Sequence, residues 1–140
     1  MRTETFSREE TFDIGKRLGE EAQKGSIITL SGDLGVGKTV FAQGVAAGLG
    51  IKDNVCSPTF TILQVYDGGR LPLYHFDAYR IEDPDEMYAI GFDDYLFGEG
   101  VCLIEWPEMI DDLLPEDVIA VHISKDTAKG VDYRIVTVER

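Results

Sequence analysis

The chain has 140 residues, with 26 acidic and 13 basic side chains and a formal net charge of −13. This length predicts one domain covering residues 1–140, and a hydrophobic share of 44% supplies a packed core, which excludes a disordered chain. The negative charge disfavours direct, tight binding of nucleic acid, because phosphates are normally bound by clustered lysine and arginine.

Membrane and export signals are absent from the pattern of apolar residues. No apolar run approaches roughly 18 residues, and the first ten residues are polar and charged. Cys56 and Cys102 are too few for a disulfide scaffold or a zinc cage, which favours a reducing compartment. We therefore expect a cytoplasmic protein that makes no membrane contact.

The first quarter of the chain predicts a strand, a helix and a second strand. Residues 3–6 can form a short strand, and Ser7 with Glu10 has the spacing of a capping box, which predicts a helix start. The apolar segment 26–31 then predicts a buried strand.

A glycine-rich loop, 32–39, and a helix follow that strand. Phe41, Val45 and Leu49 share one face of the predicted helix, and Gly50 ends it. The order strand, loop, helix is typical of the beginning of an α/β domain.

The middle of the chain predicts a hairpin, a short helix and a strand. Segments 60–66 and 71–77 can pair across the turn Asp67-Gly68-Gly69. Residues 83–90 predict a short helix, and 101–104 predict a fully apolar strand.

The end of the chain closes the sheet. Pro107 fits the first turn of a helix, and 118–123 and 133–138 predict two strands joined by a turn at 127–130. The expected fold class is α/β, with a mixed, mainly parallel central sheet flanked by helices.

The strongest motif is the loop itself, Gly-Asp-Leu-Gly-Val-Gly-Lys-Thr, which fits the pattern G-x-x-x-x-G-K-[ST]. Its amides can surround a β-phosphate, Lys38 can bridge the β- and γ-phosphates, and the Thr39 hydroxyl can bind Mg²⁺. The predicted ATP contacts are Asp33, Leu34, Gly35, Val36, Gly37, Lys38, Thr39 and Val40. A glycine-rich turn without a ligand is the alternative, and the flanking strand and helix favour the nucleotide site.

A second acidic residue is expected near the metal, because one hydroxyl holds Mg²⁺ poorly. Glu105 follows the apolar strand 101–104 and fits that role, by direct or water-mediated contact. Its alternative interpretation is a solvated carboxylate at the end of a strand.

Three further features have two interpretations each. Strand alternation puts His75, Asp77 and Tyr79 on one face, which can orient water or metal or be an ordinary half-exposed strand. The segment 59–61, with a threonine at each end, can close over the γ-phosphate or only shape a turn. Trp106 can be a core aromatic or a ligand contact.

The loop 32–39, the segment 57–61, the motif 75–80 and Glu105-Trp106, in this order and spacing, resemble the TsaE family, formerly YjeE. The resemblance spans nearly the whole chain. It implies a P-loop fold, ATP with Mg²⁺, slow hydrolysis, and association with the TsaD and TsaB subunits that make threonylcarbamoyladenosine in tRNA. It also implies that tRNA is held by the partners and not by this chain.

The resemblance also implies roles for single residues. Lys38, Asp77 and Glu105 take the catalytic positions, and Thr39 and Glu105 are the metal contacts. Trp106 lies near the nucleotide and Thr61 is the switch threonine that contacts it. The identity of the catalytic base stays open, as does the source of an arginine, for which the motifs suggest only Arg80 within this chain.

Two other functions compete with the ATPase. A small-molecule phosphotransferase would need a basic lid, and no basic cluster follows the central motifs. A nucleotide-gated binding module would need occupancy without turnover. A GTPase is disfavoured, because no [NT]-K-x-D segment is present.

Overall fold

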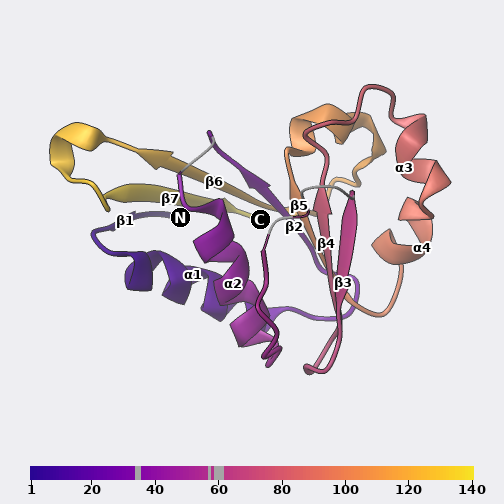
Figure 1. Ribbon diagram of the computed structural model, residues 1–140, viewed down its shortest axis with the longest axis horizontal. Coiled ribbons are helices and arrows are strands. Elements are labelled where there is room, and N and C mark those ends of the chain that lie inside the picture. The colour runs from indigo at the N-terminus through magenta and orange to yellow at the C-terminus, as the bar shows by residue number, and fades with distance from the viewer. Residues whose placement is uncertain (34–35, 57, 59–61) are drawn as a thin grey trace.

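The computed structural model describes residues 1–33, 36–56, 58 and 62–140, and its strands form one seven-stranded sheet in the order β1-β7-β6-β2-β5-β4-β3 (Figure 1). The strands are β1 Arg2–Thr5, β2 Ile27–Ser31, β3 Leu63–Tyr66, β4 Leu73–Asp77, β5 Val101–Glu105, β6 Ile119–Lys125 and β7 Arg134–Glu139. The helices are α1 Arg8–Glu21, α2 Lys38–Gly48, α3 Asp85–Ala89 and α4 Phe92–Leu96, with 3₁₀ turns η1 Pro107–Leu113 and η2 Thr127–Lys129.

The direction of the strands confirms the predicted mixed, mainly parallel sheet. Neighbours β6, β2, β5 and β4 are mutually parallel, whereas β1 with β7, β7 with β6 and β3 with β4 are antiparallel. Five strands therefore run one way and only β7 and β3 run the other way. The parallel centre is buried on both faces, as expected for strands linked by helical crossovers.

The start of α1 confirms the predicted helix cap. Ser7 Oγ accepts a hydrogen bond from Glu10 N at 3.2 Å. The return bond runs from Phe6 N to Glu10 Oε1 at 3.3 Å, one residue before the position that a full capping box uses. The helix end is therefore satisfied by local sequence alone.

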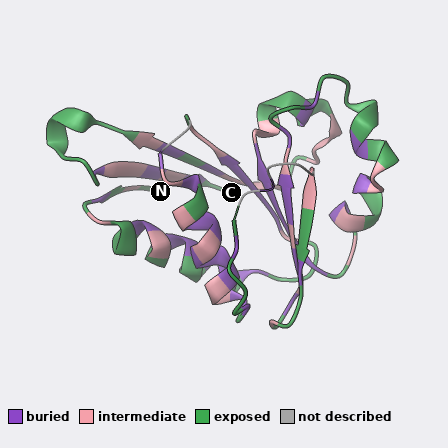
Figure 2. Cartoon of the chain, in the orientation of Figure 1, coloured by how far each residue is buried: buried purple, intermediate pink, exposed green. Residues whose placement is uncertain are grey.

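Side-chain alternation along the central strands builds one core on each face of the sheet. Ile28 of β2 and Leu103 of β5 face α1 and α2, whereas Ile27 and Ile104 face α3 and α4. Figure 2 shows the buried centre of the sheet between these two helical layers. None of the described helices combines the length and apolar character needed to cross a membrane.

Helices α1 and α2 approach each other through glycines. A Cβ on Gly19 would lie 2.2 Å from Val45 O, and one on Gly48 would lie 2.1 Å from Lys16 O. Only residues without a side chain allow the backbones to come this close. The face of α1 that meets α2 is therefore narrow, with Gly15, Leu18 and Gly19 buried.

The region between β4 and β6 differs from the prediction. The helix expected at 83–90 is present as α3, and a second helix that was not expected, α4, follows it after Gly91 in a left-handed conformation (φ 77°). Pro107 starts a 3₁₀ segment and not an α-helix. Segments this short carry too little periodicity to separate the two forms from sequence.

Candidate nucleotide and metal site

The candidate site lies where the carboxyl ends of three parallel strands meet. Leu30 on β2 pairs in register with Glu105 on β5, and Glu105 pairs with Asp77 on β4. The glycine-rich loop leaves β2 at this edge, as ligand sites in open α/β sheets generally do. The sheet therefore brings the glycine-rich loop, Asp77 and Glu105 to the same edge, although they are far apart in the sequence.

The described part of the loop has the backbone that its glycines were expected to allow. Gly32 has φ 144°, and a Cβ there would lie 2.4 Å from Ile123 O. Gly37 adopts φ 99° as the N-cap of α2, so the helix begins at Lys38. Leu34 and Gly35, predicted nucleotide contacts, lie outside the described residues.

Lys38 projects into the protein and not into solvent. Its residue is 6% exposed, and Nζ has no hydrogen-bond partner in the described part of the chain. Nζ lies 4.0 Å from the centroid of the Trp106 ring, a cation–π geometry. The centroid of the Tyr79 ring lies 4.7 Å from the centroid of the Trp106 ring. Trp106 is therefore partly buried, and its ring contacts the Lys38 ammonium.

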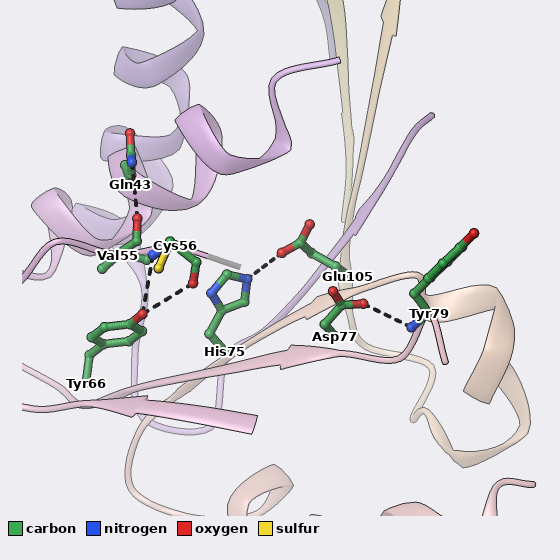
Figure 3. Close-up of polar contacts among 8 residues, drawn as sticks. All are labelled: Gln43, Val55, Cys56, Tyr66, His75, Asp77, Tyr79 and Glu105. Atoms are coloured by element: carbon green, nitrogen blue, oxygen red, sulfur yellow. Dashed lines mark hydrogen bonds and ion pairs between the residues drawn. The ribbon is translucent and has the colours of Figure 1, made fainter. Parts of the chain in front are cut away.

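Glu105 is buried, so the alternative of a solvated carboxylate is wrong. Its Oε2 lies 2.6 Å from His75 Nε2, and the two side chains are 4% and 0% exposed (Figure 3). His75 is fully buried within β4, so the alternative of an ordinary half-exposed strand is also wrong for this residue. His75, one of the polar residues predicted to share a face, therefore contacts the predicted metal acid.

Asp77 lies at the end of β4, partly buried. Its Oδ1 accepts a hydrogen bond from Tyr79 N at 3.0 Å (Figure 3). Burial raises the pKa of the Asp77 carboxyl, and the neighbouring charge of Glu105 adds to that rise, against lowering effects from the Tyr79 amide, His75 and Lys38. A carboxylate with a raised pKa is a better proton acceptor than an ordinary one.

The segment leading to the predicted switch is anchored on two sides. Gln43 Nε2 of α2 donates to Val55 O at 3.1 Å, and the Tyr66 hydroxyl contacts both Cys56 N and Cys56 O at 3.3 Å (Figure 3). Thr61, the predicted switch contact, lies outside the described residues.

Arg134 on β7 is a site residue that the sequence reasoning missed. Its Nε donates to Val36 O at 2.7 Å, and Nη1 donates to Val131 O and Tyr133 O at 2.9 and 2.7 Å. No sequence signal could have found it, because the two ends of the contact are 98 positions apart. His75, by contrast, sits two residues before Asp77 in the motif 75–80.

A cavity of about 210 Å³ lies beside the loop. Val40 and Gly37 line one side of it, and Asp132 and Arg134 line another. Val40 is one of the predicted nucleotide contacts, and the cavity extends from the end of the loop at which α2 begins.

The residues present fit a metal that arrives with a nucleotide better than a resident metal. No group of three or more His, Cys, Asp or Glu side chains that could hold an ion occurs among the described residues. Thr39 is exposed in the first turn of α2, and Glu105 is the acid at the same sheet edge. Mg²⁺ commonly takes one or two protein ligands and completes its shell with phosphates and water.

The family model and the relatives that match this sequence carry the same name. The sequence matches the family model described as "Threonylcarbamoyl adenosine biosynthesis protein TsaE" over residues 5–134. The tRNA threonylcarbamoyladenosine biosynthesis protein TsaE of Bacillus subtilis is 45% identical over 137 residues, which cover 98% of this chain and 84% of that protein. The protein of the same name from Treponema pallidum is 42% identical over 123 residues, covering 88% and 90%.

The fold agrees with these matches. The crystal structure of Bacillus subtilis YdiB superimposes with a TM-score of 0.80 and 39% sequence identity, covering 99% of this chain and 83% of that one. The match of the family model along most of the chain, together with relatives of this similarity, shows that the chain belongs to the TsaE family, with a P-loop nucleotidase fold.

Proposed function

We propose that the chain binds ATP with Mg²⁺ at the loop 32–39 and hydrolyses it slowly. In this proposal, hydrolysis supports the formation of threonylcarbamoyladenosine in tRNA by the TsaD and TsaB subunits. The observation that carries the proposal is Lys38, whose buried Nζ lacks a hydrogen-bond partner in the described part of the chain. A buried ammonium of this kind is expected where an anionic ligand supplies the missing acceptors.

The phosphate end of the nucleotide would lie at the start of α2. This helix has 11 residues, so its first amides and its dipole favour an anion at Lys38. Gly37 lets the backbone approach the ligand closely. Lys38 would leave the Trp106 face only as far as needed to contact the β- and γ-phosphates.

The metal end would lie between Thr39 and Glu105. When bound, Mg²⁺ neutralises charge that develops on the transferred phosphate. Thr39 would supply a hydroxyl oxygen, and Glu105 would supply a carboxylate oxygen directly or through water.

The nucleoside end would occupy the cavity lined by Val40, Asp132 and Arg134. This cavity adjoins the loop on the side away from Glu105. Asp132 offers hydrogen-bond acceptors to a ribose or to an amino group, and Val40 offers an apolar surface.

Asp77 would orient the attacking water. Its carboxylate lies in register with Glu105 and has a raised pKa, which suits a group that accepts a proton during water attack. Arg134 is bonded to three carbonyl oxygens, so in this proposal it does not contact the transferred phosphate. An added arginine typically contributes about 10³ to 10⁵ in rate.

The test measures ATP binding and phosphate release by the chain alone, and then with TsaD and TsaB. We expect Mg²⁺-dependent binding, slow release by the chain alone, and faster release with both subunits present. The Asp77→Ala variant should lose more turnover than affinity, as a group acting mainly in the transition state does.

Three outcomes would replace the proposal. Transfer of phosphate to a metabolite would indicate a phosphotransferase. Binding without turnover, even with both subunits, would indicate a nucleotide-gated module. Absence of ATP binding by the folded chain would contradict the site itself.

A further inference from the structure

His75 is a buried polar residue whose position the fold alone does not explain. It lies within β4, fully buried, between Tyr74 and Phe76, which both pack into the core that faces α3 and α4. One ring nitrogen, Nδ1, has no hydrogen-bond partner among the described residues. An imidazole buried in this way costs free energy, so a purely structural position at this point in the sheet would favour an apolar side chain.

The other ring nitrogen, Nε2, contacts the carboxylate of Glu105. His75 Nε2 lies 2.6 Å from Glu105 Oε2, a short distance for a hydrogen bond between a ring N–H and a carboxylate. An ionised carboxylate only accepts hydrogen bonds, so Nε2 carries the proton and donates it.

The strands fix this contact from both ends. His75 and Glu105 belong to the paired strands β4 and β5, two residues out of register with each other, so the imidazole reaches along the sheet to the carboxylate. Figure 3 shows the ring pointing from β4 toward the Glu105 carboxylate at the edge of the sheet. Since the side chains are 0% and 4% exposed, water does not compete for the bond.

We propose that His75 is a positioning residue for Glu105: its Nε2–H holds the carboxylate in one orientation, toward the metal of a bound nucleotide. The inference rests on the proposed function of the site. Groups that orient a metal ligand in this way typically contribute about 10- to 100-fold to metal affinity. Removing the N–H should therefore weaken the metal contribution to nucleotide binding and leave metal-free binding unchanged.

A matched pair of variants tests whether a hydrogen-bond donor at the position of Nε2 is required. The amide of His75→Gln extends to the place of Nε2, whereas the amide of His75→Asn extends only to the place of Nδ1. Each is titrated with ATP in Mg²⁺ and in EDTA, and the ratio of the two dissociation constants is compared with the parent. We expect His75→Gln to stay within about threefold of the parent ratio, and His75→Asn to lose about tenfold or more.

A spectroscopic measurement tests the contact without any nucleotide. The chain has two histidines, so His122→Gln leaves the imidazole signals of His75 alone in a nitrogen-detected spectrum. We expect a proton on Nε2 in the parent background, and a large shift of the Nε2 signal in the Glu105→Gln variant, because the acceptor loses its charge.

The two measurements separate the ways in which the inference can fail. Equal metal ratios for the Gln and Asn variants, or an Nε2 signal that ignores Glu105→Gln, would overturn the positioning role while the proposed function stands. A parent chain that binds no ATP would overturn the proposed function, and the spectrum would still decide whether His75 orients Glu105. If the Asn variant does not fold, a His75→Gln ratio reduced by tenfold or more overturns the inference.

Discussion

At the scale of single residues, Lys38 belongs to the glycine-rich loop motif and is buried. Its ammonium is placed over the Trp106 ring and lacks a hydrogen-bond acceptor in the described residues. The cation–π contact offsets only part of the cost of burying a charge without hydrogen-bond partners. The side chain therefore does not stabilise the folded chain, which separates its effect on binding from its effect on folding.

Replacement of Lys38 by Met tests this separation. We expect no loss in the free energy of unfolding, because the variant removes the unpaired buried charge together with the cation–π contact. ATP affinity should fall about 10- to 100-fold, because a charged hydrogen bond to phosphate contributes about 1.5–3 kcal/mol. Chemical denaturation and calorimetric titration measure the two quantities. Lys24→Met is the matched control, since Lys24 is exposed and pairs with the exposed Glu99 at 2.6 Å. Equal affinities for both variants would contradict the assignment.

Asp77 links the electrostatics of the site to the pH dependence of stability. Because the pKa of its carboxyl is raised in the folded protein, the folded state binds this proton more tightly than the unfolded chain. Ionised Asp77 therefore destabilises the folded state above the raised pKa. The penalty fades as the pH falls toward and below the ordinary carboxyl value of 3.8.

The Asp77→Asn variant should follow that sign. At neutral pH we expect it to be more stable than the parent by less than about 1 kcal/mol, because the carboxyl keeps part of its solvent contact. The difference should vanish below pH ~3. Urea unfolding at several pH values measures it, with the exposed Asp112→Asn as control. A gain that persists unchanged in acid would show that packing and not charge is responsible.

At the scale of elements, the contact between α1 and α2 holds the loop in place. The helix that begins at Lys38 packs its glycines against those of α1. Backbone atoms of each helix lie where a Cβ on a glycine of the other helix would be. Any side chain added here must push the helices apart and so move the first turn of α2.

Gly19→Ala measures the rigidity of that contact. In an open helix the change would stabilise by up to about 1 kcal/mol. Here the new Cβ would lie 2.2 Å from Val45 O, a backbone atom, so we expect a loss of about 3 kcal/mol. Glu20→Ala, on the exposed face of α1, is the control. Equal thermal midpoints for the two variants would mean that the helices separate without cost.

The elements also mark the limit of sequence prediction. The cap at Ser7, the hairpin of β3 and β4 and the strands β2 and β5 could be predicted because each depends on neighbouring residues. The division into α3 and α4 could not, since it depends on packing of Phe92 and Met87 into the core beneath β4 and β5.

At the scale of the whole molecule, the net charge is concentrated in one segment. Residues 81–124 contain 13 of the 26 acidic residues and none of the 13 basic ones, so the rest of the chain is neutral as a whole. All of these acidic residues except Glu105 are exposed. The face formed by α3, α4 and η1 is therefore strongly repulsive to phosphate backbones.

This distribution predicts that the isolated chain does not bind tRNA. We expect no saturable change in the anisotropy of labelled tRNA when the chain is added at about 0.15 M salt. A mixture with TsaD and TsaB serves as the positive control, because in the proposed function those subunits hold the tRNA. Saturable binding by the chain alone would contradict the proposed division of labour.

By itself, the sequence determined the glycine loop, the strand before it and the helix after it, because contiguous residues carry all three. It also predicted that Glu105 follows a strand, because an apolar run precedes it, and that Asp77 ends the second strand of a hairpin. Only the tertiary structure decided that His75 meets Glu105 across 30 positions and that Arg134 reaches Val36 across 98. Such contacts depend on the order of strands in the sheet, which distant burial determines and local pattern does not.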